Sequence, residues 1–327
     1  MKPTALGEFG RIRRFFAPLA GPGGLGLTDD AALLDCRPGY RLVVTVDQLV
    51  EGVHYLPNDP PELVAKKLLR RNLSDLAAMG ATPLHYLLTT ALPASFADDW
   101  VRRFAAGLAE DQERFGVALL GGDSASTPGP ASLTMTAIGE VAIGKEIRRS
   151  GAQPGDRIWV SGTIGDAFLG LKVLRTDELV GLGPAYAEAL VARYRLPEPR
   201  CGLGPRLAGI AHAMIDVSDG LIADLGHICE TSHCSATVEQ IRLPFSAESL
   251  VILCEGWEQP AALATGGDDY ELLFTAPPEM NDAIAALAAE LAVSISEIGV
   301  IEGGAGVRLV DDAGQEIPVE AAGWRHF

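Results

Sequence analysis

Aspartates beside small or hydroxylated residues recur in five segments that lie far apart in the chain. The segments are TDDAA from Thr28, TVDQLVEGVH from Thr45, NLSDLAAMGA from Asn72, GGDS from Gly121 and DVSDG from Asp216. Carboxylates repel one another, so gathering several of them is unfavourable unless a cation offsets the repulsion. Hard oxygen ligands of this kind suit Mg²⁺, which proteins usually bind together with substrate phosphates. If the fold brings the segments together, we expect their site to handle a polyphosphate.

Other polar residues are candidates for the same chemistry. Arg148 and Arg149 form either a solvated basic pair or, in a chain this acidic, a phosphate contact suited to the guanidinium fork. His54 follows Gly52-Val53 in a polar stretch, and GGDDYELLF (266–274) is a further acidic turn that enters a strand. The sequence contains no recognisable Ser–His–Asp or Cys–His pattern that would indicate a protein nucleophile.

Two sequences nearly match common nucleotide-binding loops. Residues 21–26 satisfy G-x-G-x-x-G, but they follow a helix-like segment and precede the strand-like 31–34, the reverse of the order that a dinucleotide site requires. Residues 139–146 resemble a phosphate loop, except that Glu146 stands where Ser or Thr should hold Mg²⁺. We interpret the first as a flexible loop and the second as a chance match.

Length and composition are those of a globular protein. The 327 residues suffice for two domains or one large one, with 48% hydrophobic and 21% charged residues. The formal net charge of −17 argues against nucleic-acid or anionic-membrane binding, since both need a basic surface. It does not exclude a nucleotide ligand, because bound metal reverses the local field.

Cysteine usage and the absence of a membrane signal predict a cytoplasmic protein. The five cysteines include no CxxC pair, which indicates reduced thiols. The His and Cys residues at 227–234 match no common zinc spacing, so we assign them a structural role. No run of about 18 apolar residues occurs, and the N-terminus lacks the apolar region of a signal peptide.

Hydrophobic patterning predicts strands interleaved with helices, an α/β or α+β fold. A break rich in Gly and Pro at 150–156 suggests two domains, 1–149 and 150–327. We expect strands at 41–47, 86–91, 117–120, 132–141, 157–160, 213–217, 271–275, 295–300 and 306–310, and helices at 62–79, 96–115, 165–174, 184–194, 202–212 and after Gly220.

The predicted elements place several aspartates at strand ends. Asp47 is expected to end a buried strand, Asp123 to follow one, and Asp216 to end another, so these carboxylates would face a shared edge where ligands of α/β folds bind. Asp75 falls within a predicted helix. Composition alone favours a solvent-facing side chain there as much as a metal-binding one. Asp219 could cap the next helix and still bind metal.

Taken together and in order, these segments are similar to the thiamine-monophosphate kinase family, within the superfamily of aminoimidazole ribonucleotide synthetase. The resemblance covers nearly the whole chain. Its most specific parts are DQLVEGVHY, NLSDLAAMGA, LLGGDS, RRSGAQPGDRIWVSGTIGD, DVSDGL and GGDDYELLF.

The resemblance implies a two-domain fold of mixed sheets covered by helices, a homodimer built through the N-terminal domains, and ATP-dependent phosphorylation of thiamine phosphate with several Mg²⁺ ions. It implies ATP contacts at Gly122, Asp123, Ser218 and Arg149 (or Arg148), and thiamine phosphate contacts at His54, Asp268 and Trp324. The implied Mg²⁺ ligands are Asp30, Thr45, Val46, Asp47, Asp75, Asp123, Asp216 and Asp219, from both domains, which suggests a site in the cleft between them.

Some positions depart from the family pattern. Thr28 replaces the usual glycine before the Asp29-Asp30 pair, and Asp268 is one methylene shorter than the common glutamate. Val46 replaces a hydroxylated residue, so a metal contact there must use its backbone carbonyl. The region around Ala105 lacks an aromatic that could pack on adenine.

The implied chemistry needs no protein nucleophile, because an ionised phosphate oxygen of the substrate can attack ATP directly. Two alternatives remain open. The first is a sister ATP-dependent synthetase that acts on another small substrate. The second is a catalytically silent module that binds Mg²⁺ and nucleotide.

Overall fold

The computed structural model describes residues 6–176, 179, 181–319 and 323. Their contacts divide the chain into two compact units. The first extends to Leu76 and resumes over Ala81–Gly144, and the second contains Ala77–Gly80 and the chain from Lys145 onward. The Gly- and Pro-rich segment 150–156, where the sequence suggests a boundary, therefore lies inside the second unit.

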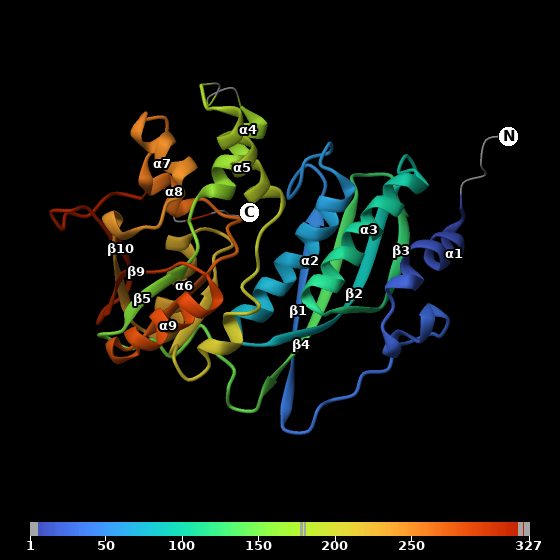
Figure 1. Cartoon of the computed structure of the whole chain (residues 1–327), viewed down its shortest axis with the longest axis horizontal. Coiled ribbons are helices and arrows are strands. Elements are labelled where there is room, and N and C mark those ends of the chain that lie inside the picture. The colour runs from blue at the N-terminus through green and yellow to red at the C-terminus, as the bar shows by residue number, and fades with distance from the viewer. Residues whose placement is uncertain (1–5, 177–178, 180, 320–322, 324–327) are drawn as a thin grey trace. The chain divides into compact units, whose positions relative to one another are not determined.

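The first unit is built on a four-stranded sheet with the order β1-β4-β2-β3 (Figure 1). Its strands are β1 (Tyr40–Val50), β2 (Thr82–Pro93), β3 (Ala118–Thr127) and β4 (Ser132–Ala142). β4 runs antiparallel to both of its neighbours, whereas β2 and β3 are parallel. β1 and β3 are thus the two edges of the sheet.

One face of this sheet is covered by two helices, α2 (Pro61–Ala78) and α3 (Asp98–Phe115) (Figure 1). The start of α2 is favoured by Pro61, whose missing N–H costs nothing in the first turn, and α3 ends at the left-handed Gly116. Along β4, Leu133, Met135 and Ala137 are fully buried and alternate with half-exposed polar residues. This period of two is that of a sheet with one covered face.

The N-terminal segment runs beside β3 at the sheet edge. It contains the short helix α1 (Glu8–Arg11), a π turn (Ile12–Phe16) and 3₁₀ turns (Ala17–Leu19 and Pro22–Leu27). The Gly21 N–H donates to the carbonyl oxygen of Leu119 at 2.9 Å. The G-x-G-x-x-G run is therefore part of an edge-covering segment, not a strand-to-helix turn.

The second unit has a six-stranded sheet with the order β10-β7-β9-β5-β8-β6. All its neighbouring strands are antiparallel except the parallel pair β10 and β7. The strands are β5 (Arg157–Ser161), β6 (Ala213–Asp216), β7 (Ser235–Glu239), β8 (Leu272–Ala276), β9 (Ile295–Glu302) and β10 (Gly306–Val310).

Helices α6 (Leu221–Ser232) and α9 (Asn281–Leu291) pack on opposite faces of this second sheet. The other helices, α4 (Asp166–Arg175), α5 (Pro184–Arg195), α7 (Ala247–Cys254) and α8 (Pro260–Thr265), pack together in a third hydrophobic cluster. One core joins Leu225 and Ile228 of α6 to Ile215 and Leu273 of the sheet. The core on the opposite face joins Leu287 of α9 to the sheet residues whose side chains point to that face.

Several sequence expectations are wrong. The segment 202–212 contains only a 3₁₀ turn, Gly204–Leu207, because its glycines and proline disfavour a continuous helix. Residues 31–34 form no strand, and β1 is an edge strand with exposed Val44 and Val46 rather than a buried one. Strand β7 and the helices α7, α8 and α9 were not expected.

No helix in the described part of the chain is long and apolar enough to cross a membrane.

Candidate active site

Three of the predicted metal ligands lie together on β1 and α2. Thr45 and Asp47 are two residues apart, so both side chains point to the same face of the strand. Arg71 and Asp75 are four residues apart and share one face of α2. The Thr45 hydroxyl donates to Asp75 Oδ2 at 2.6 Å, and Arg71 Nε lies 3.4 Å from Asp47 Oδ2. Asp75 therefore faces β1 rather than open solvent.

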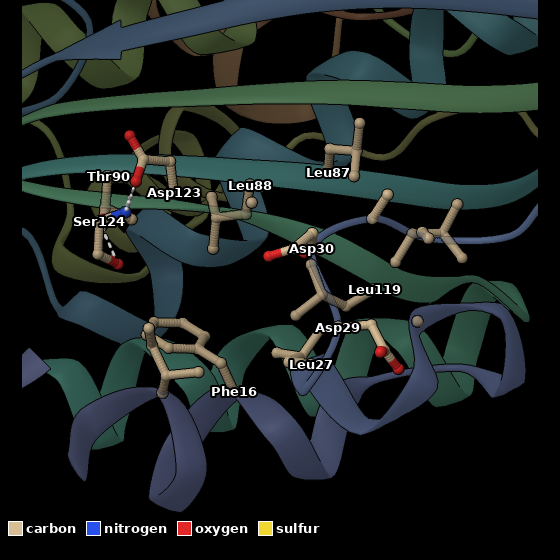
Figure 2. A pocket seen from close by; sticks show the side chains of 17 residues that line it. Phe16, Leu27, Asp29, Asp30, Leu87, Leu88, Thr90, Leu119, Asp123 and Ser124 are labelled. Atoms are coloured by element: carbon tan, nitrogen blue, oxygen red, sulfur yellow. Dashed lines mark hydrogen bonds between the residues drawn. The ribbon is translucent and has the colours of Figure 1, made fainter. Parts of the chain in front are cut away.

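A cavity of about 240 Å³ lies at the opposite edge of the same sheet, between the N-terminal segment and β3 (Figure 2). Asp29, Asp30, Gly122 and Asp123 line its polar part. Its apolar part includes Phe16, Leu27, Leu88, Leu119 and Leu120. This cavity joins an apolar surface to carboxylates, as a site for a nucleotide with its metal requires.

Glycine at position 122 lets two strands approach closely beside this cavity. A Cβ on Gly122 would collide with the carbonyl oxygen of Leu88 on β2. The next carboxylate turns back on the chain, because Asp123 Oδ1 accepts the N–H of Ser124 at 2.9 Å. Asp123 lies within β3 and Asp47 within β1, so the expectation that each marks a strand end is wrong.

These two groups of aspartates are separated by the width of the sheet. Asp47 is on one edge strand and Asp123 on the other, three strand spacings apart, or about 14 Å. Mg²⁺ holds its ligands at about 2.1 Å. The carboxylates of Asp47 and Asp123 in one chain therefore do not share an ion in this sheet.

The second unit joins two predicted segments directly. Asp216 is the last residue of β6 and is 3% exposed, as expected for the end of a buried strand. In the loop after it, the carbonyl oxygens of Val217 and Ser218 accept the N–H groups of Tyr270 and Asp268, both at 2.8 Å. DVSDG and GGDDYELLF, about 50 residues apart, thus form one paired structure.

Asp268 has an unusual backbone conformation in this structure. Asp268 and Tyr270 have φ of 72° and 54°, which is uncommon for residues other than glycine. The Tyr270 hydroxyl donates to Asp268 Oδ1 at 2.9 Å, which fixes the orientation of the carboxylate. Asp268 is half-exposed, while Asp269 and Glu271 are buried.

Asp269 and Glu271 anchor this turn from below. Asp269 Oδ2 accepts the N–H of Gly165, at the start of α4, at 2.8 Å. Burial raises the pKa of Asp269 well above its usual range, although nearby N–H groups and Arg193 oppose the shift. The fully buried Glu271 accepts hydrogen bonds from Ser161, Arg193 and Arg200. The two arginines had no signal in the sequence that distinguished them from surface residues.

Asp224, in the first turn of α6, is an acidic residue that the sequence did not single out. Its Oδ2 accepts the N–H groups of Ser218, Asp219 and Gly220 at 3.0, 3.1 and 3.2 Å. Burial, together with the charge of Asp219, raises the pKa of Asp224 to about 7, against the lowering effect of these three donors. In the sequence, the only feature that could have indicated Asp224 is its position four residues after Gly220.

Comparison with known proteins assigns the chain to a family. Models of the AIR synthase related proteins match residues 28–141 (N-terminal domain) and 153–312 (C-terminal domain). Thiamine-monophosphate kinase of Caulobacter vibrioides is 43% identical, over 98% of this chain and 90% of the relative. This chain belongs to the thiamine-monophosphate kinase family.

Solved structures of the thiamine-monophosphate kinase family have the same fold. The enzyme from Stenotrophomonas maltophilia has a TM-score of 0.81 and 41% identity, covering 89% of this chain and 91% of that one. AaThiL, solved in complex with AMPPCP and TMP, has a TM-score of 0.78 and 32% identity, covering 98% and 97%. The predicted fold of two domains with mixed sheets and helices is confirmed.

The remaining residues implied by the family resemblance occupy separate places. His54 is half-buried, and its Nδ1 accepts the N–H of Val50 at 3.0 Å, which leaves Nε2 as the protonated nitrogen. Arg148 lies 3.2 Å from Glu146, whereas no described residue pairs with the Arg149 guanidinium. Both arginines are exposed and belong to the second unit.

Trp324 lies outside the described residues. Gly323, just before it, is described and lies against the loop of the second unit, where an added Cβ would be 2.6 Å from the carbonyl oxygen of Asp219. Val46 is 61% exposed on the side of β1 opposite Thr45 and Asp47. Its backbone role stays a prediction.

The donor atoms suit Mg²⁺, which is commonly held by one or two protein carboxylates together with substrate phosphates. Asp47, Asp75 and the Thr45 hydroxyl provide such a set, and Asp30 with Asp123 provides another. Among the residues that the structure describes, no three His, Cys, Asp or Glu side chains form a metal site on their own. A set of this size is incomplete without further oxygen ligands, which fits binding together with phosphates.

Proposed function

We propose how this chain carries out the activity of its family, the ATP-dependent phosphorylation of thiamine phosphate to thiamine diphosphate. The observation that carries the function is the similarity to thiamine-monophosphate kinases over 98–99% of the chain. The paired DVSDG and GGDDYELLF loops support it, because they bring a residue implied for ATP (Ser218) beside one implied for thiamine phosphate (Asp268).

The cavity beside β3 is the proposed nucleotide site. Gly122 and Asp123 line it, and its leucines together with Phe16 offer an apolar surface for a base. Ser218 and Arg149 are the other proposed ATP contacts. His54, Asp268 and Trp324 hold thiamine phosphate, whose cationic thiazolium ring favours a carboxylate or an aromatic face.

Phosphoryl transfer then needs positioning rather than a protein nucleophile. An ionised phosphate oxygen of thiamine phosphate attacks the γ-phosphorus of ATP in line, the bond from that phosphorus to the β,γ-bridging oxygen breaks, and ADP leaves. Mg²⁺, when bound, screens the repulsion between the two anions. The proposed Mg²⁺ ligands are the set on β1 and α2 (Thr45, Asp47 and Asp75), the set beside the cavity (Asp30 and Asp123), and Asp216 with Asp219. Val46 contributes its backbone carbonyl.

We also propose that the chain acts as a homodimer in the cytoplasm. The uncovered face of the first sheet carries Val44 and Val46, which are 60% and 61% exposed, beside the half-exposed polar residues of β4. Packing this face on its counterpart around a two-fold axis parallel to the strands would place β1 of each chain opposite β3 of the other. The Asp47 side chain lies on the other side of β1, so we propose that a ligand bound at the paired edges, not a direct contact, links Asp47 of one protomer to Asp123 of its partner. All five cysteines are free, in keeping with a reducing compartment.

The activity is tested by incubating the protein with ATP, Mg²⁺ and thiamine phosphate and separating the products by chromatography. We expect thiamine diphosphate and ADP in equal amounts. Binding of ATP without turnover would support a silent nucleotide-binding module instead. Turnover that requires another phosphate acceptor would support a sister enzyme.

A further inference from the structure

The loop at residues 217–220 is held by the chain at nearly every backbone group. Asp224 Oδ2 accepts the N–H groups of Ser218, Asp219 and Gly220, and the Asp224 N–H donates back to Gly220 at 2.9 Å. The Val217 N–H donates to Glu271, and the carbonyl oxygens of Val217 and Ser218 accept from the paired loop.

Close packing adds to this restraint. A Cβ on Gly220 would lie 2.5 Å from the carbonyl oxygen of Thr265, and one on Gly267 would collide with the carbonyl oxygen of Ser218. Other segments of the same chain therefore contact the loop from several directions. The loop backbone has no room to rearrange without displacing these segments.

Three successive N–H groups before a helix commonly cradle a phosphate. Here the buried carboxylate of Asp224, 2% exposed, already occupies them. The backbone of this loop is thus not available to the phosphates of ATP. In the described part of the chain, no hydrogen bond uses the Ser218 hydroxyl or the Asp219 carboxylate, so these side chains are what the loop can offer a ligand.

We propose that Asp224 is a positioning residue for phosphoryl transfer: its carboxylate fixes the backbone of residues 218–220 and thereby the orientation of the Ser218 and Asp219 side chains. The proposal rests on the proposed roles of Ser218 and Asp219 in that reaction. Asp224 itself is buried beneath the loop and acts only through these neighbours. Its role resembles that of residues that orient metal ligands from behind, whose loss typically weakens metal affinity or activity about 10- to 100-fold.

Asp224→Ala tests the proposal against a matched control, Asp156→Ala. Asp156 is also buried in the second unit, 3% exposed, and accepts a backbone N–H (Gln153, 2.9 Å) and a hydrogen bond from His212, but it does not touch the loop. We expect Asp224→Ala to raise the Mg²⁺ concentration for half-maximal turnover about 10- to 100-fold. Both variants should lower the thermal unfolding midpoint by similar amounts, but Asp156→Ala should leave the Mg²⁺ concentration for half-maximal turnover unchanged. Asp224→Asn, which keeps one oxygen acceptor, should fall between wild type and Asp224→Ala.

Hydrogen exchange provides a readout that does not depend on turnover. The amide protons of residues 218–220 should exchange at least about 10-fold faster in Asp224→Ala, but not in Asp156→Ala. Unchanged exchange and an unchanged Mg²⁺ requirement in Asp224→Ala would overturn the positioning role, as would an equal rise in the Mg²⁺ requirement in the control. If Asp224→Ala does not fold, the same comparison is made with Asp224→Asn. Failure of the wild-type chain to form thiamine diphosphate would overturn the proposed function, while the exchange comparison would still decide whether Asp224 holds the loop.

Discussion

Asp224, Asp269 and Glu271 are each at most 2% exposed, and each accepts hydrogen bonds from the chain itself. The side chain of Asp47, by contrast, is 27% exposed and only faces an arginine at 3.4 Å. A buried carboxylate must be satisfied by the protein, because desolvation otherwise costs several kcal/mol. A partly exposed one can exchange water for an ion. Burial therefore distinguishes Asp224, Asp269 and Glu271, which hold the chain of the site in place, from Asp47, which is accessible to a ligand.

Asp47→Asn is expected to abolish most activity while the fold persists. The substitution keeps the size of the side chain but removes one negative charge from a proposed metal site, where several kcal/mol, or about 100-fold or more in turnover, are at stake. A coupled ADP-release assay measures turnover, and circular dichroism monitors the fold. The control is Asp99→Asn, an exposed residue paired with Arg102, which should have wild-type activity. Normal turnover of Asp47→Asn would refute the metal assignment.

Asp269 predicts a pH dependence of stability. Its pKa in the fold is raised, so over a range beginning near pH 4 the unfolded chain has released this proton while the folded chain keeps it. The folded state then binds more protons than the unfolded state, and the free energy of unfolding falls as pH rises, levelling off only above the folded pKa. Asp269→Asn removes this contribution. We expect urea denaturation between pH 5 and pH 8 to show a less negative pH slope for the variant than for wild type, and equal slopes would contradict the shift.

At the scale of elements, the turn at residues 268–270 holds two non-glycine residues in left-handed conformations, which cost of order 1 kcal/mol each. The pairing with residues 217–218 and the anchors below it stabilise this conformation. In this turn Asp269 and Glu271 are buried, whereas Asp268 stays accessible. The conformation thus makes neighbouring acidic residues serve different roles.

Tyr270→Phe should weaken the binding of thiamine phosphate selectively. The variant loses the hydrogen bond that orients Asp268, a contribution of about 1 kcal/mol, so we expect the KM for thiamine phosphate to rise about 3- to 10-fold while that for ATP stays constant. Tyr86→Phe is the matched control, because its hydroxyl is buried and has no hydrogen-bond partner in the described structure. Initial rates over both substrate ranges decide the matter. Parallel increases in the two KM values would count against a role on the substrate side.

The sequence predicted helices and strands well where the hydrophobic periodicity and the residues that end an element agree. α2 and α3 have long amphipathic runs closed by glycine, and they were placed within a few residues. β7 and α7 were missed, because short elements leave weak periodicity. The segment 202–212 was taken for a helix because apolar spacing outweighed its glycines, whereas the structure has a 3₁₀ turn.

The site was predictable in its residue types but not in its arrangement. The sequence indicated Thr45, Asp47 and Asp75, and the structure brings them together. It could not show that Asp47 and Asp123 lie on opposite edges of one sheet, since strand order depends on long-range pairing. Nor could it distinguish Asp224 from a helix-capping residue, because its partners are backbone N–H groups that have no sequence signature.

At the scale of the whole molecule, strand order gives the proposed dimer a role in the chemistry. Within one chain the two edge strands are about 14 Å apart, and the sheet face between them carries exposed valines. In the proposed two-fold dimer, two equivalent sites would each be completed by Asp47 from one protomer and Asp123 from the other. This arrangement makes a prediction that a site within one chain does not share.

Asp47→Asn and Asp123→Asn, each inactive alone, should restore one another in a heterodimer. If the sites are shared, one of the two sites in the heterodimer carries both substitutions and the other carries none. Two different affinity tags on co-produced chains allow the heterodimer to be isolated, and we expect about half of the wild-type activity from its single intact site. A heterodimer of Asp47→Asn with Asp75→Asn is the control, because both residues lie on the same side of the site in one chain and each site then lacks a ligand. Activity in neither heterodimer would place Asp47 and Asp123 in the same protomer's site, and a monomeric wild-type chain in sedimentation would refute the dimer itself.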